Sequence, residues 1–267
     1  MRTQKIGGVF VKNIIAGLLL SLQFFTSFPI RKTLPMNNKT VTAMFGTMPF
    51  ISFFMGVIVV LVILLNDVYF HFTTLFLAII IVIINIMMTG GLHLDGWIDL
   101  SDAYFSYRDK EKRLEILSDS RIGAFGAINL VLIVLLKIGI FYEYLHQRPT
   151  NFYLFFIILP VLCRLAILIY FNLSVNVKES GLAAYFKKHV KAKSLWIYIA
   201  CYIFIILITG FVLNEYKLFV LTFSMFVMTW IYRHWTYRHF GGMTGDLLGA
   251  LYEGMELALW GMLLLFI

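Results

Sequence analysis

The sequence predicts an all-α, polytopic integral membrane protein folded as a helical bundle, and three observations support this. Hydrophobic residues make up 61% of the 267 residues and charged residues only 13%, about half the charged share of a soluble domain. Long apolar runs recur along the chain, and a helix needs about 20 such residues to cross the hydrocarbon core. The runs lack the two-residue alternation of a membrane β-barrel, so the spans are expected to be helices.

Seven apolar runs are long enough to be spans. In chain order they cover residues 41–65, 69–89, 122–144, 152–172, 195–213, 218–232 and 247–267. An earlier run, 10–28, carries Lys12, Asn13 and Gln23, and we expect a re-entrant or interfacial helix there. No segment is long enough for a separate soluble domain, so residues 1–267 are expected to form one membrane-embedded catalytic domain.

Lysine and arginine predict how these spans are oriented. Six lie before residue 40, five in residues 90–121, five in 174–194 and two in 231–246, whereas the alternate loops are nearly empty. The positive-inside rule places the basic loops in the cytoplasm, which predicts a multi-pass protein of the cell membrane with its C-terminus outside. The net charge of +8 is explained by these basic residues beside the membrane spans. Membrane lipid is therefore the expected surrounding, and without a nucleic-acid motif no nucleic-acid partner is expected.

Acidic residues cluster after the second predicted span. Seven of the 14 in the chain fall between positions 95 and 119. On a helix, Asp95, Asp99 and Asp102 are spaced i, i+4 and i+7 and share one face. Carboxylate oxygens grouped in this way suit Mg²⁺ or Mn²⁺. Glu115 and Asp119, also spaced i, i+4, would complete a two-metal site.

The alternative is a solvated loop whose acids balance nearby bases. We assign Asp109 and Glu111 to that role and interpret the three aspartates as metal ligands. The bases are Arg108, Lys110, Lys112 and Arg113.

Glycines and an arginine accompany these acids. Gly90, Gly91 and Gly96 surround the first aspartates, and glycine permits close backbone approach to a phosphate. Arg121 stands where the third span begins. It either clamps a phosphate or anchors the span among lipid headgroups, and the sequence leaves both open.

A second group of this kind lies at residues 240–250, FGGMTGDLLGA. Gly242, Thr244 and Gly245 precede Asp246 at the predicted cytoplasmic start of the last span. A helix start of this composition is suited to phosphate binding. Because both groups fall on the same predicted side of the membrane, they can form one site.

Two glutamates lie within the last span, Glu253 and Glu256. Carboxylates are costly in lipid, so both are expected to point into the bundle. Lys137 and Arg164 are the intramembrane cations available as partners. A functional role and a buried structural ion pair both remain open.

At these residues the sequence resembles the cobalamin synthase family, the adenosylcobinamide-GDP ribazoletransferases. The matching segments are TGGLHLDGWIDLSDAYF at 89–105, RLEILSDSRIGAFGA at 113–127, ESGL at 179–182 and GGMTGDLLGALYEGMEL at 241–257. The chain departs from the family pattern at Ala103, Ser118 and Met243, where glycine, a basic residue and glutamine are usual.

The resemblance implies a Mg²⁺-dependent phosphotransferase that joins adenosylcobinamide-GDP to α-ribazole, or to its 5′-phosphate. GMP leaves, and the reaction belongs to the last steps of cobalamin biosynthesis. The metal ligands are then expected among Asp95, Asp99, Asp102, Glu115, Asp119 and Asp246. Catalysis is expected from Asp95, Asp99, Asp102, Asp119 and His93, one of which takes the proton of the attacking hydroxyl. The expected substrate-binding residues are Arg121, Arg164, Gly242, Thr244 and Gly245.

Two other functions fit parts of the pattern. A CDP-alcohol phosphotransferase that makes phospholipid uses similar acidic chemistry, although its motif spacing differs. A cation transporter also carries acids in a helical bundle, but here most acids gather at one face. The sequence leaves the oligomeric state open, a homo-oligomer included.

Overall fold

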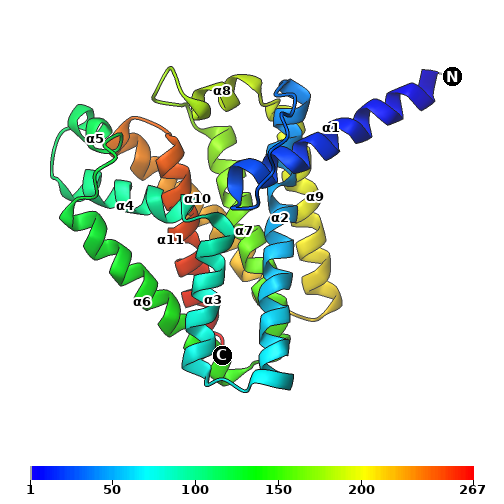
Figure 1. The fold of residues 1–267 in the computed structure, drawn as a ribbon, viewed down its shortest axis with the longest axis vertical. Coiled ribbons are helices and arrows are strands. Elements are labelled where there is room, and N and C mark those ends of the chain that lie inside the picture. The colour runs from blue at the N-terminus through cyan, green and yellow to red at the C-terminus, as the bar shows by residue number, and fades with distance from the viewer. Residues whose placement is uncertain (1) are drawn as a thin grey trace.

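The computed structural model describes residues 2–267, with side chains described from residue 11 onward, as a bundle of helices (Figure 1). Over these residues no β-strand forms, so the all-α fold class is confirmed. The elements are α1 (Arg2–Phe25), α2 (Asn38–Leu65), the π-helical turn η1 (Asn66–Phe70), α3 (Thr74–Thr89), α4 (Leu92–Phe105), α5 (Lys110–Ile116), α6 (Ala124–Gln147), α7 (Phe152–Leu173), α8 (Leu182–His189), α9 (Ala192–Val212), α10 (Lys217–Phe240) and α11 (Gly245–Leu264).

Five helices are long and apolar enough to cross a membrane within the described part of the chain: α2 continued by η1, α6, α7, α9 and α11. The pair α3 and α4 raises the number to six only if the two count as one bent span. The predicted count of seven is therefore not confirmed. Helix α3 has only 16 residues, and α10 ends in the polar stretch YRHWTYRHF.

Helix α7 is the centre of the bundle. It packs against α2, α9, α10 and α11, and 78% of its apolar window is buried within the protein, compared with 22% for α6 and for α9. The last two therefore present most of their surface outward, as expected of helices facing lipid. Local signals set where several helices begin: Asn37 and Thr40 form a reciprocal cap on α2, and Asp109 caps α5.

For the first helix, the expectation that it does not cross the membrane stays a prediction. Its apolar part, Val11–Phe25, is shorter than a span. Gly17 packs against α2, where an added Cβ would lie 2.4 Å from Cβ of Ala43. Figure 1 shows the N-terminal part of α1 projecting away from the bundle.

A sharp turn between α3 and α4 positions the acidic residues. Gly90 and Gly91 have φ of 63° and 75°, the left-handed region that glycine adopts without steric cost. The axes of α3 and α4 differ by 92°, so α4 runs across the bundle, packed between α6 and α11. Figure 1 shows α4, α5 and α8 toward the end opposite the C-terminus. The predicted basic loops that contain α5 and α8 thus share one end of the bundle.

Gly96 allows the contact between α4 and α11. A Cβ at this position would lie 2.4 Å from the carbonyl oxygen of Asp246, which is backbone and cannot move aside alone. We expect Gly96→Ala to lower the free energy of unfolding by about 1–3 kcal/mol, the usual cost of overpacking, and to reduce activity by separating the two helices. Thermal unfolding in detergent measures the first effect.

Gly139 provides the matched control, because it lies within α6 and an added Cβ there meets nothing within 4 Å. Gly139→Ala should be neutral or slightly stabilising, since alanine favours a helix over glycine. Equal stability of the two variants would contradict the close packing of α4 on α11.

Candidate active site

The two sequence motifs meet where α4 packs against the start of α11. Partial burial, followed by the negative charges of three neighbouring carboxylates, raises the pKa of Asp99 to about 7. These neighbours are Asp95, Asp246 and Asp102. Helical spacing therefore places the α4 aspartates together as predicted, and the fold adds Asp246 from the second motif. We call Asp95, Asp99 and Asp246 the acidic cluster.

The donor set of this cluster fits a hard divalent cation. Carboxylate oxygens are the ligands that Mg²⁺ prefers, and the mutual repulsion that raises the pKa of Asp99 is relieved by a cation. Lys178 acts on Asp99 in the opposite direction to the aspartates, so one cation already lies nearby. Among the described side chains no three carboxylate, histidine or cysteine groups converge closely enough to hold a metal ion. Binding would therefore require the carboxylates to turn toward one another.

Asp102 has a structural contact that the sequence did not indicate. Its Oδ2 accepts a hydrogen bond from the backbone N–H of Gly123 (2.7 Å) and its Oδ1 one from that of Gly126 (2.8 Å). The carboxylate thus caps the start of α6, where the N–H groups lack partners within the helix. A Cβ at either glycine would lie 2.3 Å from an Asp102 oxygen. These glycines make room for Asp102, and its metal-binding role stays a prediction.

Glu115 and Asp119 do not form the predicted helical pair. Helix α5 ends at Ile116, so the i, i+4 geometry between them is absent. Glu115 pairs with Lys112 on the surface. Asp119 accepts hydrogen bonds from Arg121, with Nη2 2.6 Å from Oδ2, and this bond lowers its pKa to about 2.

None of the hydrogen bonds or ion pairs of the described side chains joins Glu115 or Asp119 to the acidic cluster. Arg121 is exposed, and its guanidinium would have to exchange Asp119 for a substrate phosphate. The proposed phosphate contact of Arg121 therefore remains a prediction.

Arg164 and His93 form a buried pair beside the cluster. Nη1 of Arg164 lies 2.8 Å from Nε2 of His93, and Nε of Arg164 donates to Oγ of Ser52 (3.1 Å). A guanidinium can only donate, so Nε2 of His93 is the unprotonated acceptor. Burial, with the charge of Arg164, holds the pKa of His93 well below its usual value. Because this nitrogen is occupied, the aspartates are better placed than His93 to take a proton from substrate.

The predicted phosphate-binding residues at the start of α11 have distinct environments. Oγ1 of Thr244 accepts from the N–H of Leu247 (3.3 Å) and caps the helix. Gly242 is buried, and a Cβ there would lie 2.6 Å from the carbonyl oxygen of Val175, so its role in the fold is close packing. Gly245 lines a cavity together with Asp246. Of the three, Gly245 is the one open to a ligand.

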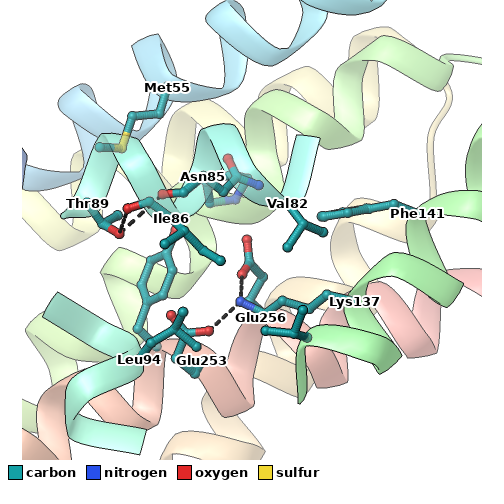
Figure 2. Close-up of a pocket in the computed structure, with 13 residues that line it drawn as sticks. Met55, Val82, Asn85, Ile86, Thr89, Leu94, Lys137, Phe141, Glu253 and Glu256 are labelled. Carbon is teal, nitrogen blue, oxygen red and sulfur yellow. Dashed lines mark hydrogen bonds and ion pairs between the residues drawn. The ribbon is translucent and has the colours of Figure 1, made fainter. Parts of the chain in front are cut away.

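Glu253 and Glu256 both pair with Lys137 in the interior of the bundle (Figure 2). The Lys137 Nζ–Glu256 Oε2 distance is 2.6 Å, and all three side chains are buried. The ion triad joins α6 to α11, and Figure 2 shows Asn85 and Thr89 of α3 nearby. Lys137 is thus the partner of both glutamates, and this geometry favours the structural alternative for them.

The sequence did not indicate the cavity beside the acidic cluster. Asp95, Asp246, His93 and Arg164 line part of it, with an empty volume of about 830 Å³. Five phenylalanines are among its other lining residues: Phe24, Phe25, Phe45, Phe171 and Phe186. They come from α1, α2, α7 and α8, so no local spacing in the sequence connects them.

Comparison with known proteins matches the chain to one enzyme family. The family model described as cobalamin-5-phosphate synthase matches residues 17–264. An adenosylcobinamide-GDP ribazoletransferase of Halalkalibacterium halodurans is 34% identical over 263 residues, covering 95% of this chain and 97% of the relative. Enzymes of the same name from Geobacillus sp. (strain WCH70) and Geobacillus thermodenitrificans are 33% and 32% identical, covering 95% and 92% of this chain and 97% and 94% of the relatives. No solved structure matches.

Proposed function

This chain belongs to the cobalamin-5-phosphate synthase family, and from that premise we propose that it transfers α-ribazole onto adenosylcobinamide-GDP at the acidic cluster. The relatives are named adenosylcobinamide-GDP ribazoletransferase, and this chain matches nearly their whole length. One observation supports the placement most strongly. The two family motifs, 150 residues apart, meet where Gly96 of α4 contacts Asp246 of α11.

The reaction exchanges one phosphoester bond for another. A ribose hydroxyl of α-ribazole attacks the phosphorus bonded to the cobinamide arm, and GMP departs with the electrons of the broken P–O bond. Asp95, Asp99 and Asp246 would hold Mg²⁺, which when bound neutralises phosphate oxygens and stabilises the leaving group. Asp95 is exposed and lines two cavities, so it is placed to accept the proton of the hydroxyl.

GMP release tests this function. Purified protein in detergent receives Mg²⁺, adenosylcobinamide-GDP and α-ribazole, and chromatography follows GMP. We expect GMP only when both substrates are present, and its loss when the metal is chelated. Release of CMP from a CDP-alcohol instead would favour the phospholipid enzyme, and nucleotide-independent ion flux in liposomes would favour a transporter.

The raised pKa of Asp99 predicts how metal binding depends on pH. With a pKa of about 7, the carboxylate is mostly ionised at pH 8 and mostly protonated at pH 6, so Mg²⁺ affinity should fall about tenfold between them. The folded carboxyl holds its proton more tightly than the unfolded one, so the metal-free protein should lose stability as the pH rises from about 4 to 7. Calorimetric titration of Mg²⁺ at pH 6, 7 and 8 measures the affinity. An affinity independent of pH would contradict a metal role for Asp99.

We further propose that the acidic cluster faces the cytoplasm, in the cell membrane. The support is the distribution of lysine and arginine. Two of the loops that are rich in these residues contain α5 and α8, which lie at the same end of the bundle (Figure 1). Single cysteines at positions 36 and 110 should be labelled from the same, cytoplasmic side by a membrane-impermeant maleimide. Labelling from opposite sides would overturn this topology.

A further inference from the structure

We propose that the enclosed cavity beside the acidic cluster binds the aromatic base of α-ribazole, with its ribose directed at Asp95 and Asp246. The inference rests on the proposed function and names the site of one of its two substrates. It is carried by the shape of the cavity, its aromatic wall and a buried guanidinium nitrogen that lacks a partner.

Six helices enclose this cavity: α1, α2, α4, α7, α8 and α11. The empty space between its walls, measured out to where it opens to solvent, is about 830 Å³. Helix α8 closes it through Leu182, Ala183 and Phe186. A base joined to a ribose fits such a space. A corrinoid ring with its side-chain amides and adenosyl ligand is far larger.

The aromatic wall matches a flat, uncharged heterocycle. Phe45 stacks on Phe171 with ring centroids 4.4 Å apart, and Phe186 meets Phe24 and Phe45 edge to face at 5.4 Å and 5.5 Å. Rings held in this way offer apolar faces and edges to a further aromatic ring. The dimethylbenzimidazole of α-ribazole carries no charge at neutral pH and two methyl groups, so its burial there is favourable.

One residue of the cavity wall carries a hydrogen-bond donor without an acceptor. Arg164 is 1% exposed, and its Nη2 has no hydrogen-bond partner among the described side chains. A buried donor without a partner is energetically unfavourable. The residue stands nine positions before the end of α7, about 13 Å along the helix axis. The free ring nitrogen of the benzimidazole is an acceptor of the kind that Nη2 lacks.

The second substrate has a different approach to the same carboxylates. Asp95 also lines an open cavity formed by the α3–α4 turn and α6, which shares only Phe24, Leu92 and Asp95 with the enclosed one. An open cavity can take the activated arm of a corrinoid whose ring stays outside. The two substrates would thus reach Asp95 from two sides, as a displacement at phosphorus requires.

Blocking the enclosed cavity tests the assignment. Ala183→Trp places an indole in it from the short surface helix α8, without removing a core side chain. Ala184→Trp is the matched control, because the next residue on a helix points about 100° away and Ala184 does not line the cavity. We expect Ala183→Trp to weaken α-ribazole binding at least tenfold, measured by quenching of benzimidazole fluorescence, and to leave the Kd for adenosylcobinamide-GDP unchanged. Ala184→Trp should match the wild type for both ligands.

Three outcomes would overturn the proposal. In the first, Ala183→Trp binds α-ribazole with wild-type affinity. In the second, it loses affinity for adenosylcobinamide-GDP instead, which would place the guanine base in the cavity. In the third, Arg164→Met folds, as judged by size-exclusion chromatography, and still binds α-ribazole as the wild type does.

The cavity assignment and the transferase activity can fail separately. If the wild type binds α-ribazole and Ala183→Trp does not, but no GMP forms from the substrate pair, the proposed function is wrong and the site stands. If GMP forms and Ala183→Trp leaves the KM for α-ribazole unchanged, the site is wrong and the function stands.

Discussion

Asp99→Asn is expected to lower kcat/KM for GMP release by about 1,000-fold. The substitution keeps the shape of the side chain but removes one of the charges that would hold Mg²⁺. A loss of about 4 kcal/mol in stabilisation of the transition state corresponds to that factor. Asp95→Asn and Asp246→Asn should have effects of similar size, because the charges of both residues act on Asp99 within the same cluster. GMP release under saturating Mg²⁺ measures all three.

Glu111→Gln is the matched control for these variants, because Glu111 is exposed on α5 and lies outside the cluster. It should retain wild-type turnover. All four proteins should insert into the membrane and elute alike in detergent. Wild-type turnover in the three aspartate variants would contradict the assignment of the cluster as the catalytic centre.

Lys137→Met is expected to produce the largest loss of stability, about 3–5 kcal/mol, because it leaves Glu253 and Glu256 buried without their cation. Both glutamates belong to α11, the helix that also carries Asp246. Loosening α11 should therefore also disturb the acidic cluster. Unfolding in mixed micelles of increasing SDS content, followed by far-ultraviolet circular dichroism, measures the free energy.

The triple variant Lys137→Met, Glu253→Gln, Glu256→Gln separates charge from packing. It removes the unpaired charges together with the cation, so most of the lost stability should return, as when a buried ion pair is replaced as a unit. A Lys137→Met protein as stable as the wild type would contradict the ion triad. A triple variant as unstable as the single one would assign the effect to lost packing.

Much of the site could be predicted because its residues belong to two local patterns. The spacing of Asp95, Asp99 and Asp102 predicts a shared helix face whatever surrounds it, and α4 is helical over all three. Placing Asp246 beside them required the charge distribution, which puts both motifs on one side of the membrane. The structure shows the contact at Gly96.

Other features of the structure are contacts between residues far apart in the chain, which no local spacing in the sequence predicts. The capping of α6 by Asp102 joins residues 21 and 24 positions apart, and the Lys137 triad joins residues 116 and 119 positions apart. The shared helix predicted for Glu115 and Asp119 was wrong because α5 is a single short helix that ends at Ile116, and their role as metal ligands stays a prediction. The predicted count of seven spans is not confirmed at α3, where the chain forms η1 and a turn over residues 66–73 and leaves a helix of 16 residues.

The departures from the family pattern fall mainly at packing positions. Ala103 is fully buried beside Leu100 and Leu117. Met243 is also fully buried, and its backbone N–H donates to the carbonyl of Val175 (2.9 Å). Ser118 is exposed and donates to the carbonyl of Leu114. Ala103 and Met243 are therefore expected to affect stability more than substrate binding.

Direct counting of bound Mn²⁺ tests the central claim that the acidic cluster is a metal centre. Free Mn²⁺ gives a six-line electron paramagnetic resonance spectrum that weakens on binding, so a titration of purified protein yields both the number of sites and the Kd. We predict saturable binding by the wild type at pH 8, displaced by Mg²⁺, and its loss in the triple variant Asp95→Asn, Asp99→Asn, Asp246→Asn. Unchanged Mn²⁺ binding by a folded triple variant would contradict the claim.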